Sequence, residues 1–322
     1  MTFLSKWKAP DAEQIPDFII AGAMKSGTTT LHHILDQHPD IFLPKGEIGF
    51  WDMDDIITHF DFNHYDKAAG KWTYQSMEEN HSEMWRWYGN KFSEAGKRVK
   101  GEDSTSYMAS YRVPDRLAMQ DKKIKVIFLL RNPIDRTYSN YYHLLRTGRA
   151  IYSFEDTLQY HPESILTRSL YSRHLARYYD LLPAEQILVL RFENLISDPQ
   201  STVNRVCKFI DVDPTKINAS AVQIHSNPSR LPKSEKLQRL RNRLFRSAGN
   251  SRYLSRLPAK KKNSHVSITL RIFDALHRNI NPLTQRKPKP MKVATRSFLE
   301  HFFEHELLDL AKLASSENQL ND

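Results

Sequence analysis

Residues 18–30 read Phe-Ile-Ile-Ala-Gly-Ala-Met-Lys-Ser-Gly-Thr-Thr-Thr, and this stretch decides the fold. An apolar run that predicts a buried strand leads into a loop of small residues, and a helix is expected to follow from residue 28. Glycine lets backbone N–H groups approach an anion closely, and the first turn of a helix presents further N–H groups to it. Lys25 adds a positive charge and Thr28 a hydroxyl. The stretch therefore predicts a phosphate-binding loop.

The general pattern nearest to this loop is the nucleotide-triphosphate loop GxxxxGK(S/T). Gly22 and Gly27 keep the spacing of its glycines, but Thr28 stands where that pattern has lysine. The lysine lies inside the loop instead, at Lys25. Without a lysine after the second glycine, the loop favours a shorter phosphorylated donor over ATP with magnesium. A nucleotide kinase or NTPase stays open as the alternative.

A second predicted anion site begins about a hundred residues later. Residues 125–130 form another buried apolar run, which leads directly into Arg131-Asn-Pro-Ile-Asp-Arg136-Thr-Tyr-Ser139. Proline suits the first turn of a helix, so a strand, a turn and a helix are expected here. Arg131, Arg136 and Ser139 can then offer guanidinium and hydroxyl donors to one phosphate. Two such sites on neighbouring strand ends predict a nucleotide with two separate phosphate groups.

The two motifs, KSGTTTL at residues 25–31 and RNPIDRTYSNY at residues 131–141, resemble the donor-binding motifs of the sulfotransferase family. That family uses 3′-phosphoadenosine 5′-phosphosulfate (PAPS) as its donor. The similarity is greatest to the glycan-type and bacterial branch, because His38-Pro39 and Lys45-Gly-Glu47 follow the first motif as they do there. The resemblance covers residues 16 to about 215. It implies sulfuryl transfer to a hydroxyl or amine, on a P-loop-like α/β fold and without a metal.

The resemblance also implies which residues bind the donor. Arg131 and Ser139 are expected at the 3′-phosphate, and residues 26–29 at the 5′-phosphate. Lys25 is expected to contact the bridging oxygen, where its charge would stabilise the departing nucleotide. The expected donor-binding residues are Lys25, Ser26, Gly27, Thr28, Thr29, Arg131, Ser139 and Tyr171.

Glu47 is the first candidate for the base that deprotonates the acceptor. A glutamate at the matching position serves this role in the glycan sulfotransferases, and Ile48, Phe50 and Trp51 are expected to desolvate its carboxylate. The structural alternative is a salt bridge to Lys45. With Lys25, Glu47 completes the predicted catalytic pair.

Three neighbouring positions depart from the pattern or compete with Glu47. Gly49 stands where the glycan enzymes often carry a histidine, so the contact of that ring is expected to be missing. Asp103 replaces a lysine of the heparan-modifying enzymes, which argues against heparan sulfate as the acceptor. Glu102 is a second candidate base. His32 and His33 are expected to be packing or surface residues.

Short apolar runs alternate with helical segments along residues 16–215. This alternation predicts a parallel sheet covered on both faces, in a three-layer α/β fold with ligand bound beyond the carboxyl ends of the strands. The expected strands are residues 17–22, 41–43, 98–102, 124–130 and 187–192. The expected helices are residues 28–37, 134–146 and 168–182.

The rest of the chain is assigned to a single domain, residues 1–322, around that core. Residues 52–92, which are irregular or helical in expectation, and residues 225–290 are predicted to wall the acceptor site. The aromatic rings of residues 52–92 could equally pack only the lid of the core. A final amphipathic helix is expected over residues 295–313, docking through Phe298, Phe302, Leu307 and Leu310.

Composition adds a charge asymmetry. The chain of 322 residues has a net charge of +10, and residues 230–262 contain twelve Lys or Arg against one acid. This basic stripe fits an anionic acceptor, a peripheral membrane contact or a solvated face, and a non-catalytic polyanion-binding protein stays open as a further alternative. No nucleic-acid-binding module accompanies the charge.

Three features of the sequence bear on the cellular location of the protein. The sequence holds one cysteine, Cys207, and no apolar run of about 20 residues. The first eleven residues lack the apolar core of a signal peptide. We therefore expect a cytoplasmic enzyme, with a homodimer as an open alternative.

Overall fold

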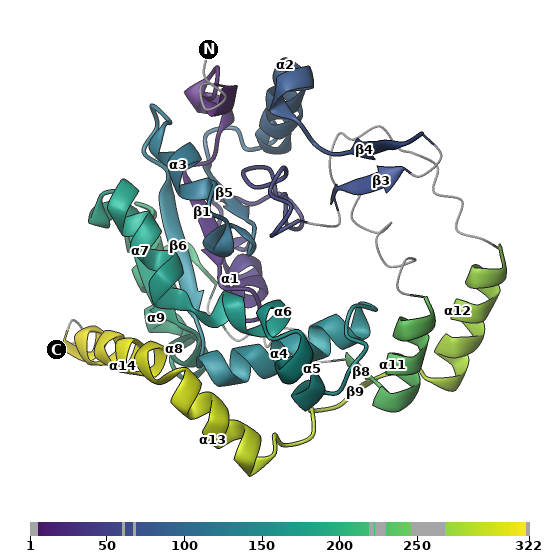
Figure 1. Ribbon diagram of the computed structural model, residues 1–322. Coiled ribbons are helices and arrows are strands. Elements are labelled where there is room, and N and C mark those ends of the chain that lie inside the picture. Colours follow the sequence, from purple (N-terminus) through teal and green to yellow (C-terminus); the bar gives the residue numbers. More distant parts are fainter. Residues whose placement is uncertain are drawn as a thin grey trace.

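The computed structural model describes residues 6–59, 62–66, 69–218, 222, 230–245 and 268–319. Its centre is a five-stranded sheet in the order β2-β5-β1-β6-β7, and every pair of neighbouring strands is parallel (Figure 1). The five strands are β1 (Phe18–Gly22), β2 (Ile41–Phe42), β5 (Val99–Asp103), β6 (Lys125–Leu130) and β7 (Ile187–Arg191). The prediction of a parallel α/β sheet is confirmed, and each expected strand lies within one or two residues of its predicted ends.

The two central strands bury side chains on both faces of the sheet. In β1, Phe18 and Ile20 point into one apolar cluster and Ile19 and Ala21 into the other. The residues of β6 alternate in the same way. Successive side chains of a strand face opposite sides, so a strand between two helical layers must be apolar throughout. This is why residues 18–22 and 125–130 read as continuous apolar runs.

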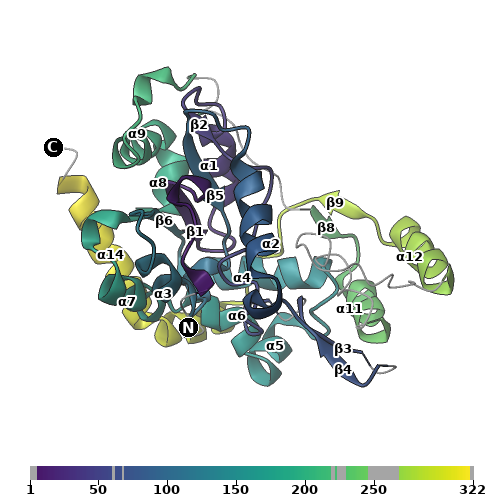
Figure 2. The same cartoon turned by 90° about the horizontal axis from the view of Figure 1, so that it is seen from above.

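Helices cover the two faces as separate layers (Figures 1 and 2). On one face lie α1 (Thr28–Leu35), α8 (Phe192–Ser197) and α9 (Pro199–Phe209). On the other lie α2 (Met77–Gly89), α3 (Val113–Ala118), α7 (Tyr171–Leu181) and part of α14 (Glu304–Gln319). This arrangement leaves the carboxyl ends of β1 and β6 open for the site.

A third apolar cluster forms below those strand ends. It joins α4 (Pro133–Arg146), α5 (Phe154–Tyr160) and α6 (Glu163–Leu166) to α13 (Val293–Phe302). The prediction of one C-terminal helix over residues 295–313 is wrong, because the chain breaks into α13 and α14 at Phe303. Leu299 and Phe303 are buried, whereas Phe298 and Phe302 are 58% and 45% exposed. Of the predicted docking residues, Leu310 is buried and Leu307 partly buried.

Residues 52–92 contain a strand pair that the sequence did not indicate. β3 (His64–Asp66) and β4 (Lys71–Thr73) form an antiparallel hairpin, and α2 follows it. The rings of Trp85 and Tyr88 are buried in the core, so for them the packing alternative holds. Tyr65 and Trp72 are exposed.

The segment after α9 carries a second antiparallel pair, β8 (Arg230–Pro232) with β9 (Leu283–Gln285), next to α11 (Glu235–Leu244) and α12 (Ile268–Ile280). Both helices stand away from the central sheet (Figures 1 and 2).

The predicted basic stripe lies outside the described residues from 246 onward. Among the helices that the structure describes, none is both long and apolar enough to cross a bilayer.

Candidate active site

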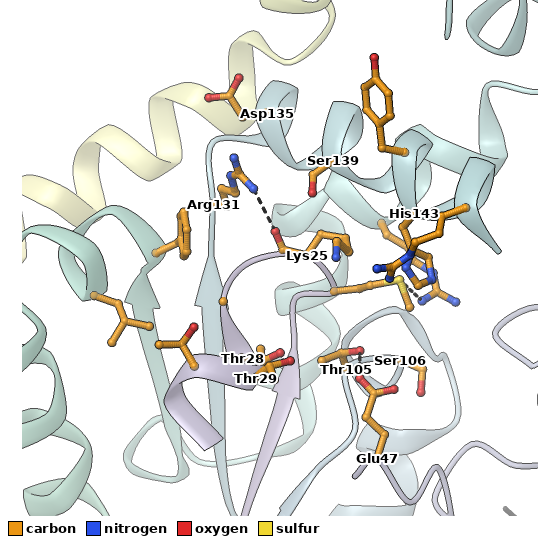
Figure 3. A pocket seen from close by; sticks show the side chains of 18 of the residues that line it. Lys25, Thr28, Thr29, Glu47, Thr105, Ser106, Arg131, Asp135, Ser139 and His143 are labelled. Carbon is orange, nitrogen blue, oxygen red and sulfur yellow. Dashed lines mark hydrogen bonds between the residues drawn. The ribbon is translucent and has the colours of Figure 1, made fainter. Parts of the chain in front are cut away.

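A cavity of about 1100 Å³ opens at the carboxyl ends of β1 and β6. Both predicted anion motifs contribute to its wall, as does the loop that carries Glu47 (Figure 3). Of the predicted site residues, those that line the cavity are Lys25, Gly27, Thr28, Thr29, Glu47, Arg131 and Ser139. The structure therefore brings together residues that are more than a hundred positions apart in the sequence.

The first motif forms a tight loop ahead of α1. Gly27 is the N-cap residue, with a left-handed φ of +88°, and Lys25 also has a positive φ of +71°. Because the first N–H groups of a helix have no partner within it, those of Thr28 and Thr29 are available to an anion. A non-glycine residue in the left-handed region is strained, and such strain is concentrated at functional loops.

The two motifs are linked by a hydrogen bond. The guanidinium of Arg131 donates to the carbonyl oxygen of Lys25 at 3.4 Å (Figure 3). The same guanidinium lies 5.0 Å from the centre of the Phe192 ring. Asn132 caps α4 by accepting from the N–H groups of Ile134 and Asp135, so the helix that carries Ser139 begins beside the loop. The result is one anion-binding surface built from two strand ends.

Gly27 supplies the first testable prediction. A Cβ at this position would lie 2.6 Å from a ring carbon of Phe192, whereas a Cβ at Gly46 would meet nothing within 4 Å. Both glycines have a left-handed φ, so Gly46→Ala is a matched control for backbone strain. We expect Gly27→Ala to cost about 1–3 kcal/mol more folding free energy than Gly46→Ala, measured by urea unfolding. Equal costs for the two variants would show that Phe192 moves away without penalty.

Positive charge dominates the cavity. Burial lowers the pKa of Lys25 below its usual value, and the neighbouring charges of Arg146 and Arg131 lower it further. Burial also lowers the pKa of His143 to about 3, and Lys25, Arg149 and Arg146 add to this shift. His143 is therefore neutral at physiological pH. Cations held this close together repel one another, and an anionic ligand relieves that repulsion.

Further arginines of the cavity wall were not found from the sequence, among them Arg168 and Arg149. Arg168 lines the cavity and donates to the carbonyl oxygen of Thr58 at 3.2 Å and to the sulfur of Met24 at 3.4 Å. Arg149 also lines the cavity, next to His143. Neither belongs to a recognisable motif, so only the fold could reveal them.

Arg136 does not line the cavity. It is fully buried, and its guanidinium donates to the hydroxyl of Ser169 and to the carbonyl oxygen of Ile165. The expectation that Arg136 contacts a phosphate is therefore wrong. Arg136 instead fastens α4 to the turn that carries Arg168, because Ser169 is its neighbour in the chain.

Ser26 and Tyr171 lie behind the cavity rather than on its wall. The Ser26 side chain is fully buried, and its N–H donates to the carbonyl oxygen of Ala23 at 3.2 Å. That N–H is thus already used within the loop, against the expectation that it binds phosphate. Tyr171 is buried and donates its hydroxyl to the carbonyl oxygen of Arg131 at 2.9 Å. It thereby supports the backbone of Arg131 from behind the cavity wall.

Glu47 faces the cavity from an exposed position. Its Oε1 accepts a hydrogen bond from the hydroxyl of Thr105 at 2.7 Å (Figure 3). The expected desolvation by Ile48, Phe50 and Trp51 does not occur, because these three side chains point into the core and leave Glu47 exposed. Glu47 is thus exposed on the cavity wall, where a substrate can reach it.

Glu102 and Asp103 do not line the cavity. Glu102 is fully buried, so it cannot meet an acceptor in this structure. Asp103 is also buried, with Oδ2 at 3.5 Å from Nδ1 of His32. His32 is buried and His33 exposed, as expected for packing and surface residues. Glu47 is therefore the only one of the two candidate bases that reaches the cavity.

A histidine does lie against Gly49, although it comes from another part of the chain. The ring of His59 lines the cavity, and a Cβ at position 49 would be 3.5 Å from it. Its Nε2 is 2.7 Å from Oδ1 of the fully buried Asp52 and 3.1 Å from the hydroxyl of Ser106. Position 49 itself carries no ring, and the imidazole beside it comes from His59 instead. An irregular loop delivers the ring, and no sequence pattern marks it.

Comparison with known proteins agrees with this geometry. A family model described as the Sulfotransferase domain matches residues 15–282. Heparan sulfate glucosamine 3-O-sulfotransferase 5 of Homo sapiens is 27% identical over 214 residues, covering 63% of this chain and 55% of the relative. Bifunctional heparan sulfate N-deacetylase/N-sulfotransferase 2 of Homo sapiens is 27% identical over 223 residues, covering 64% and 23%.

Among solved structures, a sulfotransferase from Alicyclobacillus acidocaldarius has a TM-score of 0.49 and 25% sequence identity, covering 75% of this chain and 94% of that one. The chain spans about half the length, or less, of the curated relatives named above. The family match nevertheless extends over most of the chain and includes both anion motifs. This protein therefore belongs to the sulfotransferase domain family.

Proposed function

We propose that this protein transfers a sulfuryl group from PAPS to a hydroxyl or amine of a glycan acceptor. The observation that carries the proposal is the pair of anion-binding motifs at the ends of β1 and β6, joined by the hydrogen bond from Arg131 to Lys25. A nucleotide with phosphates at both the 3′ and 5′ positions needs two such sites at once. The free N–H groups of Thr28 and Thr29, the nearby cations and the cavity volume of about 1100 Å³ fit this donor.

The donor supplies an activated sulfuryl group, and the residues of the chain align and stabilise its transfer. Thr28 and Thr29 hold the 5′-phosphate, and Arg131 with Ser139 holds the 3′-phosphate. Glu47 takes the proton of the acceptor as the new bond to sulfur forms. The bond from sulfur to the 5′-phosphate oxygen breaks, and Lys25 stabilises the negative charge left on that phosphate. Most of the catalytic effect comes from alignment and charge stabilisation.

Further cations in the cavity favour an anionic acceptor. Arg149, Arg168 and Arg230 line the cavity in addition to the residues assigned to the donor. The names of both relatives refer to heparan sulfate, which is an anionic glycan. Carboxylate or sulfate groups on the acceptor would be attracted to these guanidinium groups.

Calorimetric titration with 3′-phosphoadenosine 5′-phosphate (PAP), beside ATP with magnesium, tests the proposal. We expect PAP to bind and ATP with magnesium to bind far more weakly. Replacing Arg131 with alanine should weaken PAP binding about 10- to 100-fold, because a charge-assisted contact to phosphate is worth roughly 1.5–3 kcal/mol. Arg173→Ala is the control, since Arg173 is exposed on α7 and does not line the cavity.

Two outcomes would count against the proposal. A preference for ATP with magnesium would favour the kinase alternative. PAP affinity that is equal in Arg131→Ala and Arg173→Ala would show that the donor lies elsewhere. Where PAP binds as expected, transfer of radioactive sulfate from PAPS to carboxylated and neutral glycans identifies the acceptor.

A further inference from the structure

A buried carboxylate lies directly behind the loop that carries Glu47. Glu102, at the carboxyl end of β5, is fully buried, and three hydroxyl groups donate hydrogen bonds to it. The donors are Ser104, at 2.8 Å, and the phenols of Tyr88 and Tyr107. We call Glu102 and these three hydroxyl residues the hub.

The hub holds the chain immediately after Glu47. The hydroxyl oxygens that donate to Glu102 also accept four N–H groups from residues 48–51. Ser104 accepts from the backbone N–H groups of Ile48, at 3.2 Å, and Gly49, at 2.9 Å. Tyr107 accepts from the backbone N–H of Trp51 at 3.1 Å, and Tyr88 accepts from the indole N–H of Trp51 at 2.7 Å. The backbone N–H groups of Ile48, Gly49 and Trp51 and the indole N–H of Trp51 are therefore held through one carboxylate. Glu47 is displayed toward the cavity at the start of this segment.

The hydrogen-bond pattern requires an ionised Glu102. Each hydroxyl has a single proton, and in the hub each proton points at the carboxylate, which leaves the hydroxyl oxygen free to accept an N–H group. A protonated carboxyl group would itself need an acceptor. It would have to compete with the N–H groups of the loop for the same hydroxyl oxygens. Protonation would thus disrupt at least one of the hydroxyl-to-carboxylate bonds through which residues 48–51 are held.

We propose that Glu102 is a positioning residue for Glu47 and that its protonation releases the 48–51 loop, so that the hub switches the site off as the pH falls. This inference rests on the proposed function only for the role of Glu47. The loop and the hub are defined by the contacts themselves.

The surroundings of Glu102 place the switch near neutral pH. Burial raises the pKa of Glu102 to about 7, against the opposing effect of the bonds from Tyr107, Tyr88 and Ser104, and the nearby charge of Asp52 raises it further. The ring of His59 lies beside Asp52, with Nε2 at 2.7 Å from Oδ1. The carboxyl group is therefore ionised above about pH 7 and becomes protonated as the pH falls through that value. The phenols of Tyr88 and Tyr107 have raised pKa values because they are buried beside Glu102, so they stay protonated throughout.

The NMR signal of the Trp51 indole N–H can be used to follow the hub in the absence of any substrate, because this group donates to Tyr88. In protein labelled with ¹⁵N at its five tryptophans, Trp51→Phe identifies the Trp51 signal as the one that disappears. We expect this signal in the wild-type protein to shift between pH 5.5 and 8.5 with a midpoint near 7. In Glu102→Gln, whose side chain is neutral at every pH, it should stay at its low-pH position. Histidine side chains generally change charge between pH 5 and 8, so a histidine near the hub could also shift the Trp51 signal. The control is His59→Gln, in which the midpoint of the Trp51 titration should stay near 7.

Transfer and donor binding complete the test. Transfer from PAPS should fall as the pH drops through 7 in the wild-type protein, and in Glu102→Gln it should be at least tenfold lower without that pH dependence. PAP affinity should be the same in both. A Trp51 signal that does not respond between pH 6 and 8, or that titrates equally in Glu102→Gln, would overturn the inference. Absence of PAP binding in the wild-type protein would instead refute the proposed function, while the Trp51 titration would still test the hub.

Discussion

Replacing Glu47 with glutamine is expected to slow sulfuryl transfer by about 10²- to 10⁴-fold, the range typical of general-base catalysis. The amide keeps the shape of the side chain and can still accept from the hydroxyl of Thr105, but it cannot take a proton. PAP affinity should be unchanged, because the donor-binding residues belong to other segments. The rate is measured as transfer of radioactive sulfate from PAPS to glycans, beside PAP calorimetry.

The control for this variant is Glu300→Gln. Glu300 is exposed on α13 and does not line the cavity, so its replacement removes a charge without touching the site. Transfer by Glu47→Gln that equals transfer by Glu300→Gln would exclude Glu47 as the base. The imidazole of His59, which lines the same cavity and is held by Asp52, would then be the next group to replace.

The sheet and the donor loop could be predicted from the sequence because both are encoded locally. Residues 125–130 form a strand buried on both faces, and such a strand must be a continuous apolar run. The loop before α1 needs Gly27 for its left-handed backbone and Lys25 for its charge, so spacing alone reveals it. These features depend on neighbours within a few residues.

The acceptor side of the site could not be predicted, because contacts between distant residues create it. Thr105 meets Glu47 across 58 positions, and Arg168 reaches the Thr58 carbonyl oxygen across 110. Glu102 illustrates the same difficulty. A glutamate at a strand end is compatible with a catalytic base, and only the surrounding hydroxyls show that it is buried and positions the loop.

The C-terminal helices show how a small error in phase misplaces a buried face. Phe302 and Phe303 are adjacent, and a shift of one residue turns a helix by about 100°. The predicted face contained Phe298 and Phe302, whereas Leu299 and Phe303 are the buried pair. The sequence allows either choice, and packing against the cluster around α4 decides between them.

Replacing Lys25 with methionine is expected to reduce transfer by about 10²- to 10³-fold, the range found when a group that stabilises developing charge is lost. Methionine has a similar length and, like lysine, must adopt the positive φ of +71°, so the backbone strain of the loop is retained. The carbonyl oxygen that accepts from Arg131 also remains. The change therefore removes only the ammonium group.

PAP affinity separates the two roles of this lysine. PAP keeps the 5′-phosphate but lacks the sulfuryl group, so its binding should weaken only about tenfold, by roughly 1.4 kcal/mol, while the rate falls more. Lys45→Met is the control, because Lys45 is exposed near Glu47 but does not line the cavity. Equal losses in rate and in PAP affinity would mean that Lys25 stabilises the bound nucleotide and the transition state equally. A charge that acts on the departing phosphate must instead affect the transition state more than the bound product, because negative charge develops there as the bond to sulfur breaks.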